Sequence, residues 1–186
     1  TKFLKNDQQL KVLVVIPEAH QKLWNELSDN ITQNKRVQFC FGGNTRYHSV
    51  TNGLKELKAE PNDLVAIHDA VRPLLSNDLI ERCFMEAEKV GNAIPCTKVV
   101  ETLRELNESD STWVNRSNYR AIQTPQTFQF KVLKDAYSQP FSELFTDDAS
   151  VVESLGTRVN LIAGERNNIK ITTQEDLALA QLLIQQ

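Results

Sequence analysis

Short apolar runs alternate with amphipathic segments along the first half of the chain. Three runs rich in β-branched or aromatic residues predict strands of a parallel sheet: 10–16, 37–41 and 64–67. Between and after them, apolar residues at helical spacing predict three helices: 20–27, 46–58 and 76–89. Another short strand begins at Ala93. This alternation favours an α/β fold with a doubly wound, mostly parallel sheet.

The rhythm changes after residue 98. Residues 99–121 are strand-like but polar, with a turn at 107–111, and predict a protruding β-arm. Two isolated strands are marginally stable in water, so such an arm needs another surface to pack on. We expect that surface to be a second subunit, with arms exchanged in a homodimer; the alternative is an arm folded onto its own domain.

The last third of the chain returns to helical patterns. Helices are predicted at 131–138 and 147–155, the second capped by Thr146, and a strand at 159–163. A capping box at Thr172 or Thr173 predicts a C-terminal helix that ends near Gln186, with a buried stripe that includes Leu179 and Leu182.

Length and charge limit the possible functions. The 186 residues suit a single domain with a real core. A net charge of -3 provides no general field for nucleic acid, so a polyanionic substrate must meet a local cluster of Lys and Arg. Three cysteines without metal-type spacing favour a reducing cytoplasm. No apolar run is long enough to cross a membrane, and no signal peptide is visible.

The run 64–67 ends abruptly in charged residues. His68, Asp69 and Arg72 follow it, and Pro73 prevents the strand from continuing. The carboxyl ends of strands are where open α/β sheets bind ligands. There Asp69 can hold a hard cation, and Arg72 can bind a phosphate with its planar guanidinium. A purely structural turn, capped by Asp69 and paired with Arg72, fits this stretch equally well.

Two further stretches carry candidate chemistry. Gly42 and Gly43 lie between a strand and a helix, a context that suits phosphate or the edge of a base. Lys170 alternates with Ile169 and Ile171, so we expect it to point away from a buried side; a solvated surface lysine is the alternative.

Pro125 interrupts a polar stretch between the arm and the helix at 131–138. We expect the chain to leave the sheet at this proline. Thr124 and Gln126 would then face a cleft.

Five stretches fall in the order of the motifs of one known family: 42–54, 68–73, 123–126, 145–150 and 169–172. Over nearly its whole length the chain resembles the methylerythritol-phosphate cytidylyltransferases of the non-mevalonate isoprenoid pathway. The resemblance implies a Rossmann-like nucleotidyltransferase domain of the nucleotide-diphospho-sugar transferase type. It also implies a homodimer and the transfer of CMP from CTP to 2-C-methyl-D-erythritol 4-phosphate with Mg²⁺, releasing pyrophosphate.

The resemblance also implies residue roles. CTP would contact four residues of the glycine turn and the following helix: Gly42, Gly43, Asn44 and Ser49. Asp69 would face the metal and the triphosphate. The acceptor would contact six residues, the second and third from the partner subunit: Arg72, Thr102, Arg116, Thr124, Thr146 and Lys170. Lys170 and Arg116 would be the catalytic residues, because neutralising charge at the reacting phosphates is the main requirement of this reaction.

The chain departs from the family at its start. Residues 1–10 do not match the strand and glycine-rich loop with which the family begins, and we expect these to be missing from this sequence. Asn44 stands where the family often has Asp. Two alternatives follow: a ribitol-5-phosphate cytidylyltransferase, which shares these motifs, and a non-catalytic nucleotide-binding or dimerisation module if the loop is truly absent. Acceptor assays and the intact mass of the protein distinguish them.

Overall fold

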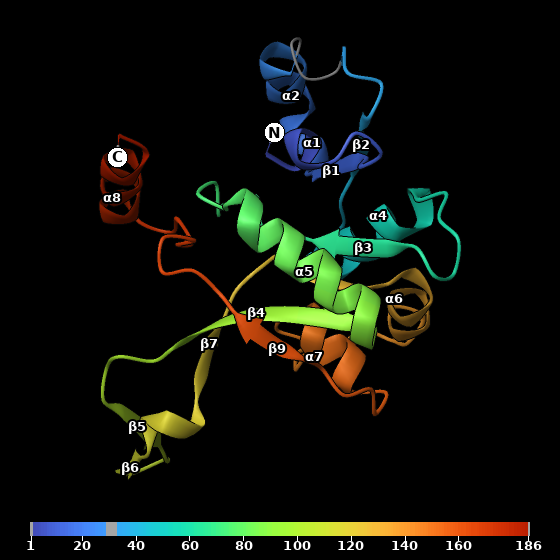
Figure 1. The fold of residues 1–186 in the computed structure, drawn as a ribbon. Helices are drawn as coiled ribbons and strands as arrows, with labels where there is room; N and C mark the ends of the chain where they lie inside the picture. Colours follow the sequence, from blue (N-terminus) through green and yellow to red (C-terminus); the bar gives the residue numbers. More distant parts are fainter. Residues whose placement is uncertain (1, 29–32, 186) are drawn as a thin grey trace.

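The computed structural model describes residues 2–28 and 33–185, and Figure 1 shows their arrangement. Thr1 and Gln186, where two of the sequence predictions fall, lie outside these residues. The strands are β1 Val12–Ile16, β2 Val37–Phe41, β3 Leu64–Ile67, β4 Asn92–Lys98, β5 Leu103–Leu106, β6 Ser111–Val114, β7 Arg120–Ile122, β8 Gln126–Gln129 and β9 Leu161–Ala163. The α-helices are α1 Lys2–Asn6, α2 Gln21–Leu27, α4 Arg46–Glu56, α5 Asn77–Val90, α6 Phe130–Ala136, α7 Asp148–Glu153 and α8 Gln174–Ile184; short 3₁₀ turns are η1 Glu18–His20 and η2 Arg116–Asn118.

The α/β class is confirmed, but the described sheets are mixed rather than mostly parallel. β1 pairs with β2 in parallel, and β9 pairs with β4 in parallel. The central order is β3-β8-β4-β7, and every neighbouring pair in it is antiparallel. The reason is the arm: the chain runs out along β4, turns in the β5–β6 hairpin, and returns beside β4 as β7 and β8.

β3 therefore differs from the expected strand. It pairs antiparallel with β8, with Leu64 opposite Gln129, and its residues are only half-buried. The sequence reading missed β8 because Pro125 and polar residues fill this stretch. Gln126 is nevertheless buried, with its amide bonded to the Asp147 carboxylate and to the Ala149 N–H. A buried polar side chain with partners is compatible with a central strand.

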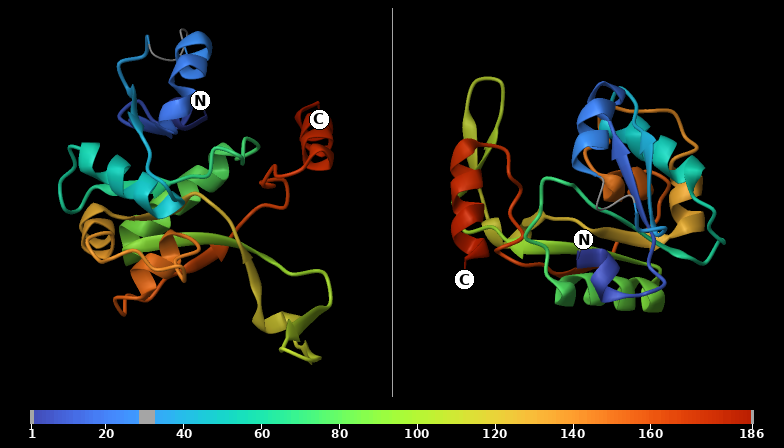
Figure 2. Two further views of the ribbon diagram at one scale, coloured as in Figure 1. Left: turned by 180° about the vertical axis from the view of Figure 1, so that it is seen from behind. Right: turned by 90° about the horizontal axis from the view of Figure 1, so that it is seen from above.

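Helices cover both faces of the central sheet (Figures 1 and 2). α5 packs on one face, where Leu79, Ile80 and Cys83 form a core with Ala93 of β4. Ile94, the next residue of β4, faces the second core, which contains Phe128 and residues of α4, α6 and α7. The cap of α5 is the predicted Ser76, and Gly91 ends this helix with φ 91°. These two layers hold the carboxyl end of β3 in place.

The arm and the C-terminal helix extend from this body (Figure 1). Leu106 and Trp113 of the hairpin are 81% and 61% exposed. α8 begins at a Thr173–Asp176 capping box as expected, but Leu179 and Leu182, predicted as buried, are exposed. α7 is capped by Asp147 rather than Thr146, because the Asp147 carboxylate accepts from the Ser150 N–H. No helix in residues 2–28 and 33–185 is long and apolar enough to cross a membrane.

Candidate active site

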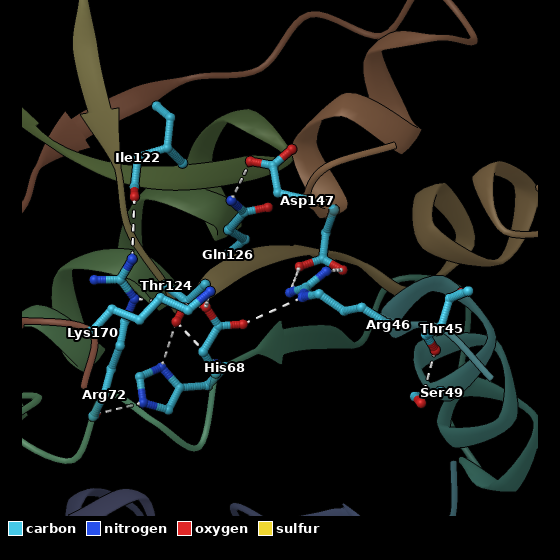
Figure 3. Close-up of polar contacts among 12 residues, drawn as sticks. Thr45, Arg46, Ser49, His68, Arg72, Ile122, Thr124, Gln126, Asp147 and Lys170 are labelled. Atoms are coloured by element: carbon cyan, nitrogen blue, oxygen red, sulfur yellow. Dashed lines mark hydrogen bonds and ion pairs between the residues drawn. The ribbon is translucent and has the colours of Figure 1, made fainter. Parts of the chain in front are cut away.

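Three cationic side chains surround the carboxylate of Asp69, just beyond β3 (Figure 3). Arg46 Nε lies 3.3 Å from Asp69 Oδ1. On the other oxygen, Oδ2, Arg72 Nε lies at 3.7 Å and Lys170 Nζ at 3.5 Å. Asp69, Arg72 and Lys170, which the sequence predicted as site residues, are thus brought together from segments about 100 residues apart in the chain.

The cluster favours an ionised Asp69. Burial by itself raises the pKa of this carboxyl, but the charges of Arg46, Lys170 and Arg72 outweigh it and hold the pKa below its usual value. Three cations and two carboxylates, Asp69 and the Asp148 that pairs with Arg46, leave a local excess of one positive charge. A group of this kind attracts phosphates to the carboxyl end of β3 in a protein whose net charge is -3.

His68 and Thr124 fix the backbone that carries Asp69. The Thr124 hydroxyl accepts from the Asp69 N–H at 3.0 Å and lies 3.0 Å from His68 Nδ1. His68 Nε2 lies 3.0 Å from the Arg72 carbonyl, which can only accept, so Nε2 carries the proton and Nδ1 accepts from Thr124. Burial lowers the pKa of His68, which favours this neutral ring.

Arg46 connects Asp69 to a second, fully buried carboxylate. Its two terminal nitrogens donate to Asp148 at 2.9 and 2.7 Å, in the paired geometry typical of guanidinium and carboxylate. The Tyr137 hydroxyl donates to the same Asp148 at 2.6 Å. Burial opposes the charge of Arg46, but these contacts with Asp148 raise its pKa. Arg46 and Asp148 were given no role by the sequence analysis, although they lie in the stretches 42–54 and 145–150 and each begins a helix.

The glycine turn approaches the first turn of α4 closely. A Cβ on Gly42 would lie 2.6 Å from Ser49 Oγ, and one on Gly43 would lie 2.5 Å from His48 Cβ. The Gly43 N–H donates to Ser49 Oγ at 3.1 Å, and Thr45 caps the helix. Only glycine allows this approach, so both positions are set by packing as well as by any ligand.

A family sequence profile matches residues 1–186, and its description is 2-C-methyl-D-erythritol 4-phosphate cytidylyltransferase. The chain belongs to this family. The enzyme of this name from Bacteroides fragilis is 44% identical over 182 residues, which are 98% of this chain and 82% of the relative. The membership confirms the expected family and the class of activity, a nucleotidyltransferase of isoprenoid biosynthesis.

Solved structures of the family share the fold. The cytidylyltransferase from Thermus thermophilus superposes with a TM-score of 0.80 at 30% identity, covering 100% of this chain and 88% of that one. The enzyme from Francisella tularensis gives a TM-score of 0.81 at 29% identity, covering 97% and 83%. The α/β fold described above therefore matches that of solved cytidylyltransferases.

Of the other predicted site residues of this cytidylyltransferase family member, Thr124 contacts Asp69 directly, whereas Asn44, Thr102, Arg116 and Thr146 are exposed on loops and on the arm. Asn44 and Thr146 are exposed on the loops before α4 and α7. Thr102 and Arg116 are exposed on the arm, where the Arg116 guanidinium donates to the Val100 carbonyl. Thr124 is close to Asp69, but it is 4% exposed and its hydroxyl is engaged by the backbone and by His68. Neither Thr124 nor Gln126 faces a cleft, contrary to the sequence prediction.

A magnesium ion fits this site only together with a ligand. Among residues 2–28 and 33–185, no group of three or more His, Cys, Asp or Glu side chains could hold a metal. Asp69 is ionised and its side chain is 15% exposed, so it can supply one carboxylate. Mg²⁺ usually binds one or two carboxylates together with substrate phosphates and water, which agrees with a single protein ligand.

A cleft of about 250 Å³ lies beside Arg72, at the base of the arm. Lys98 at the end of β4 and Glu101 of the arm line one side, and Arg166 and Asn168 line it from the loop before Lys170. Arg72 also donates to the Asn168 carbonyl at 2.9 Å, so one guanidinium contacts both this cleft and Asp69. Arg72 thus links Asp69 to the cleft at the base of the arm.

Proposed function

We propose that this protein transfers CMP from CTP to 2-C-methyl-D-erythritol 4-phosphate and releases pyrophosphate. The observation that carries the proposal is the group of Arg46, Arg72 and Lys170 around the Asp69 carboxylate. Two anions must approach each other in this reaction, and fixed cations at the end of a strand lower the cost of that approach. The proposal also rests on membership in the family.

No side chain has to activate the nucleophile, because the acceptor phosphate is already an anion. One of its oxygens forms a bond to the α-phosphorus of CTP, and the bond to the pyrophosphate oxygen breaks. Lys170 would neutralise charge on the reacting phosphates, and Arg72 would bind the acceptor from the side of the cleft. Mg²⁺, held by Asp69 and the triphosphate, would supply further neutralisation when bound.

The glycine turn would receive the cytidine. Gly42 and Gly43 bring the backbone close to α4, Asn44 is exposed beside them, and Ser49 holds the turn by its bond to the Gly43 N–H. Exposed backbone N–H and carbonyl groups can match the donors and acceptors of a base edge. We assign the turn this role because it precedes the helix that supplies Arg46.

We assign the arm, residues 99–121, to a homodimer in which arms are exchanged. The exposed Leu106 and Trp113 support this assignment, because two apolar side chains on an isolated hairpin gain stability by packing on a partner. Thr102 and Arg116 would then reach the acceptor in the partner's site. Thr146, exposed before α7, would contact the acceptor within its own subunit.

We further propose that the nucleotidyltransferase domain includes a strand and a glycine-rich loop missing from residues 1–186. Within the described residues, β1 pairs only with β2 and β3 pairs only with β8, so each has one free edge. A strand parallel to both would join the two sheets into one doubly wound sheet, and its loop would wrap the triphosphate.

The three free thiols support a cytoplasmic location.

Pyrophosphate release by the full-length protein tests the proposal. CTP and Mg²⁺ are supplied with methylerythritol phosphate, with ribitol 5-phosphate, or with no acceptor, and Asp69→Asn is compared with Arg82→Lys on the far helix α5. We expect release with methylerythritol phosphate only, and its loss in Asp69→Asn alone. Release with ribitol 5-phosphate instead would favour the sister activity, and no release with either acceptor would favour a binding module.

A further inference from the structure

The pair formed by Arg46 and Asp148 joins a partly exposed guanidinium to a fully buried carboxylate: the Arg46 side chain is 35% exposed and that of Asp148 is 0% exposed. Asp148 is completely buried at the start of α7, and it accepts three hydrogen bonds, two from Arg46 and one from Tyr137. Burying a carboxylate is costly unless it is paired and hydrogen-bonded. A hydrophobic core is stable without a buried carboxylate. The Arg46–Asp148 pair is therefore better explained by the other contact that Arg46 makes.

Arg46 has one further contact, with Asp69. Its Nε lies 3.3 Å from Asp69 Oδ1, while both terminal nitrogens are held by Asp148. A guanidinium is planar, so fixing two nitrogens also fixes the direction of the third. The Asp69 carboxylate is therefore oriented by a group on α4, the Arg46 side chain labelled in Figure 3.

Tyr137 holds the far end of this chain of contacts. Its hydroxyl donates to Asp148, and its ring stacks on Tyr47 with centroids 4.9 Å apart. The contacts thus join four segments in sequence: the end of β3, α4, α7 and the residue that follows α6. Such partners orient a metal ligand, and their loss typically lowers metal affinity or activity about 10- to 100-fold.

We propose that Arg46 is a positioning residue, held by Asp148 and Tyr137, that fixes the Asp69 carboxylate with Oδ2 turned toward the metal-bound triphosphate. Oδ1 is bonded to Arg46, so Oδ2, which contacts Arg72 and Lys170, is the oxygen that would face the metal ion and the triphosphate when they are bound. The inference rests on the proposed function, because it gives Asp69 its role.

Three variants of the full-length protein test this role. Arg46→Lys keeps the positive charge but cannot contact both carboxylates, and Tyr137→Phe keeps the stacked ring but removes the hydroxyl. Arg82→Lys is the matched control, because the partners of Arg82, which are Asp78, Glu165 and the Ala163 carbonyl, do not include Asp69 or Asp148. Mn²⁺ binding in the presence of CTP is measured by the electron paramagnetic resonance signal of the free ion, and the Mg²⁺ requirement of turnover and the melting temperature are measured beside it.

We expect Arg46→Lys to weaken Mn²⁺ binding about 10- to 100-fold, and Tyr137→Phe to weaken it in the same direction but less. The double variant should be no weaker than Arg46→Lys, because Tyr137 acts through Arg46. Arg82→Lys should match the wild type. A lower melting temperature with unchanged Mn²⁺ binding in both site variants would overturn the proposal, and Tyr137→Phe decides the matter if Arg46→Lys fails to fold.

The experiment distinguishes a failure of the positioning role of Arg46 from a failure of the proposed function. If the wild type binds Mn²⁺ with CTP but releases no pyrophosphate, the proposed transfer fails while the comparison of variants still stands. If the wild type turns over and its Mg²⁺ requirement is the same in Arg46→Lys, only the positioning role fails. Wild-type protein that binds no Mn²⁺ with CTP overturns both.

Discussion

Replacing Lys170 by Ala should separate activity from stability. The Lys170 side chain is 49% exposed, and its Nζ lies 3.5 Å from Asp69 Oδ2. Ion pairs at exposed sites contribute about 0–1 kcal/mol to folding, because water and salt screen them. For a domain of this size, about 1 kcal/mol shifts the melting temperature by about 2–4 °C. The variant should therefore melt within a few degrees of the wild type.

The effect on turnover should be much larger. If Lys170 neutralises charge that grows on the reacting phosphates, its removal should lower kcat by about 10²- to 10³-fold, the usual cost of losing one such contact. Lys170→Arg should retain part of the rate, because it keeps the charge but changes the geometry of the contact. The exposed Lys131 on α6 provides the matched control, and Lys131→Ala should leave both quantities unchanged.

Steady-state pyrophosphate release and thermal unfolding measure the two effects on the same preparations. Equal kcat values for Lys170→Ala and the wild type would remove Lys170 from the mechanism. A melting temperature lowered as far as that of a core variant would show that Lys170 acts on folding instead. Either result would refute the reasoning, because the structure predicts a small change in stability together with a large change in rate.

Three further results follow from the same contacts. Mixed Arg116→Ala and Lys170→Ala proteins should recover partial activity if sites are shared between subunits; no recovery, despite subunit exchange confirmed by mass spectrometry, contradicts the exchanged arm. Thr124→Val should lose about 1–3 kcal/mol of unfolding free energy in urea titrations, because the Asp69 N–H and His68 Nδ1 lose their common partner. The pKa of His68 is lowered by burial, so its contribution to stability is fully present above the unfolded value of about 6.5 and declines as the pH falls from there. His68→Gln should flatten that decline in unfolding titrations between pH 7 and 5, and an unchanged slope would show that His68 is not its source.

The sequence predicted local features of the fold better than long-range ones. Element type and local chemistry followed from short patterns: Ser76 and Thr173 cap their helices, and Gly91 ends α5 with a left-handed residue. Short patterns did not predict whether neighbouring strands pair in parallel or antiparallel. β8 was missed because Gln126 and Thr127 resemble a loop. The partners that explain the burial of Gln126, Asp147 and the Ala149 N–H, lie at the start of α7, which no local window contains.

The site shows the same limit. Asp69 and Lys170 could be found because each follows or interrupts an apolar pattern, and a family resemblance added their roles. Arg46 gave no such signal, because an arginine at the start of a helix is ordinarily a surface residue. The positive end of the helix dipole also disfavours a cation at this position. Only the pairing with Asp148, 102 residues later, explains it. A cation at the start of a helix is tolerated when a buried carboxylate pairs with it and a ligand site needs it. A residue that conflicts with the helix dipole within a motif is therefore a candidate positioning residue.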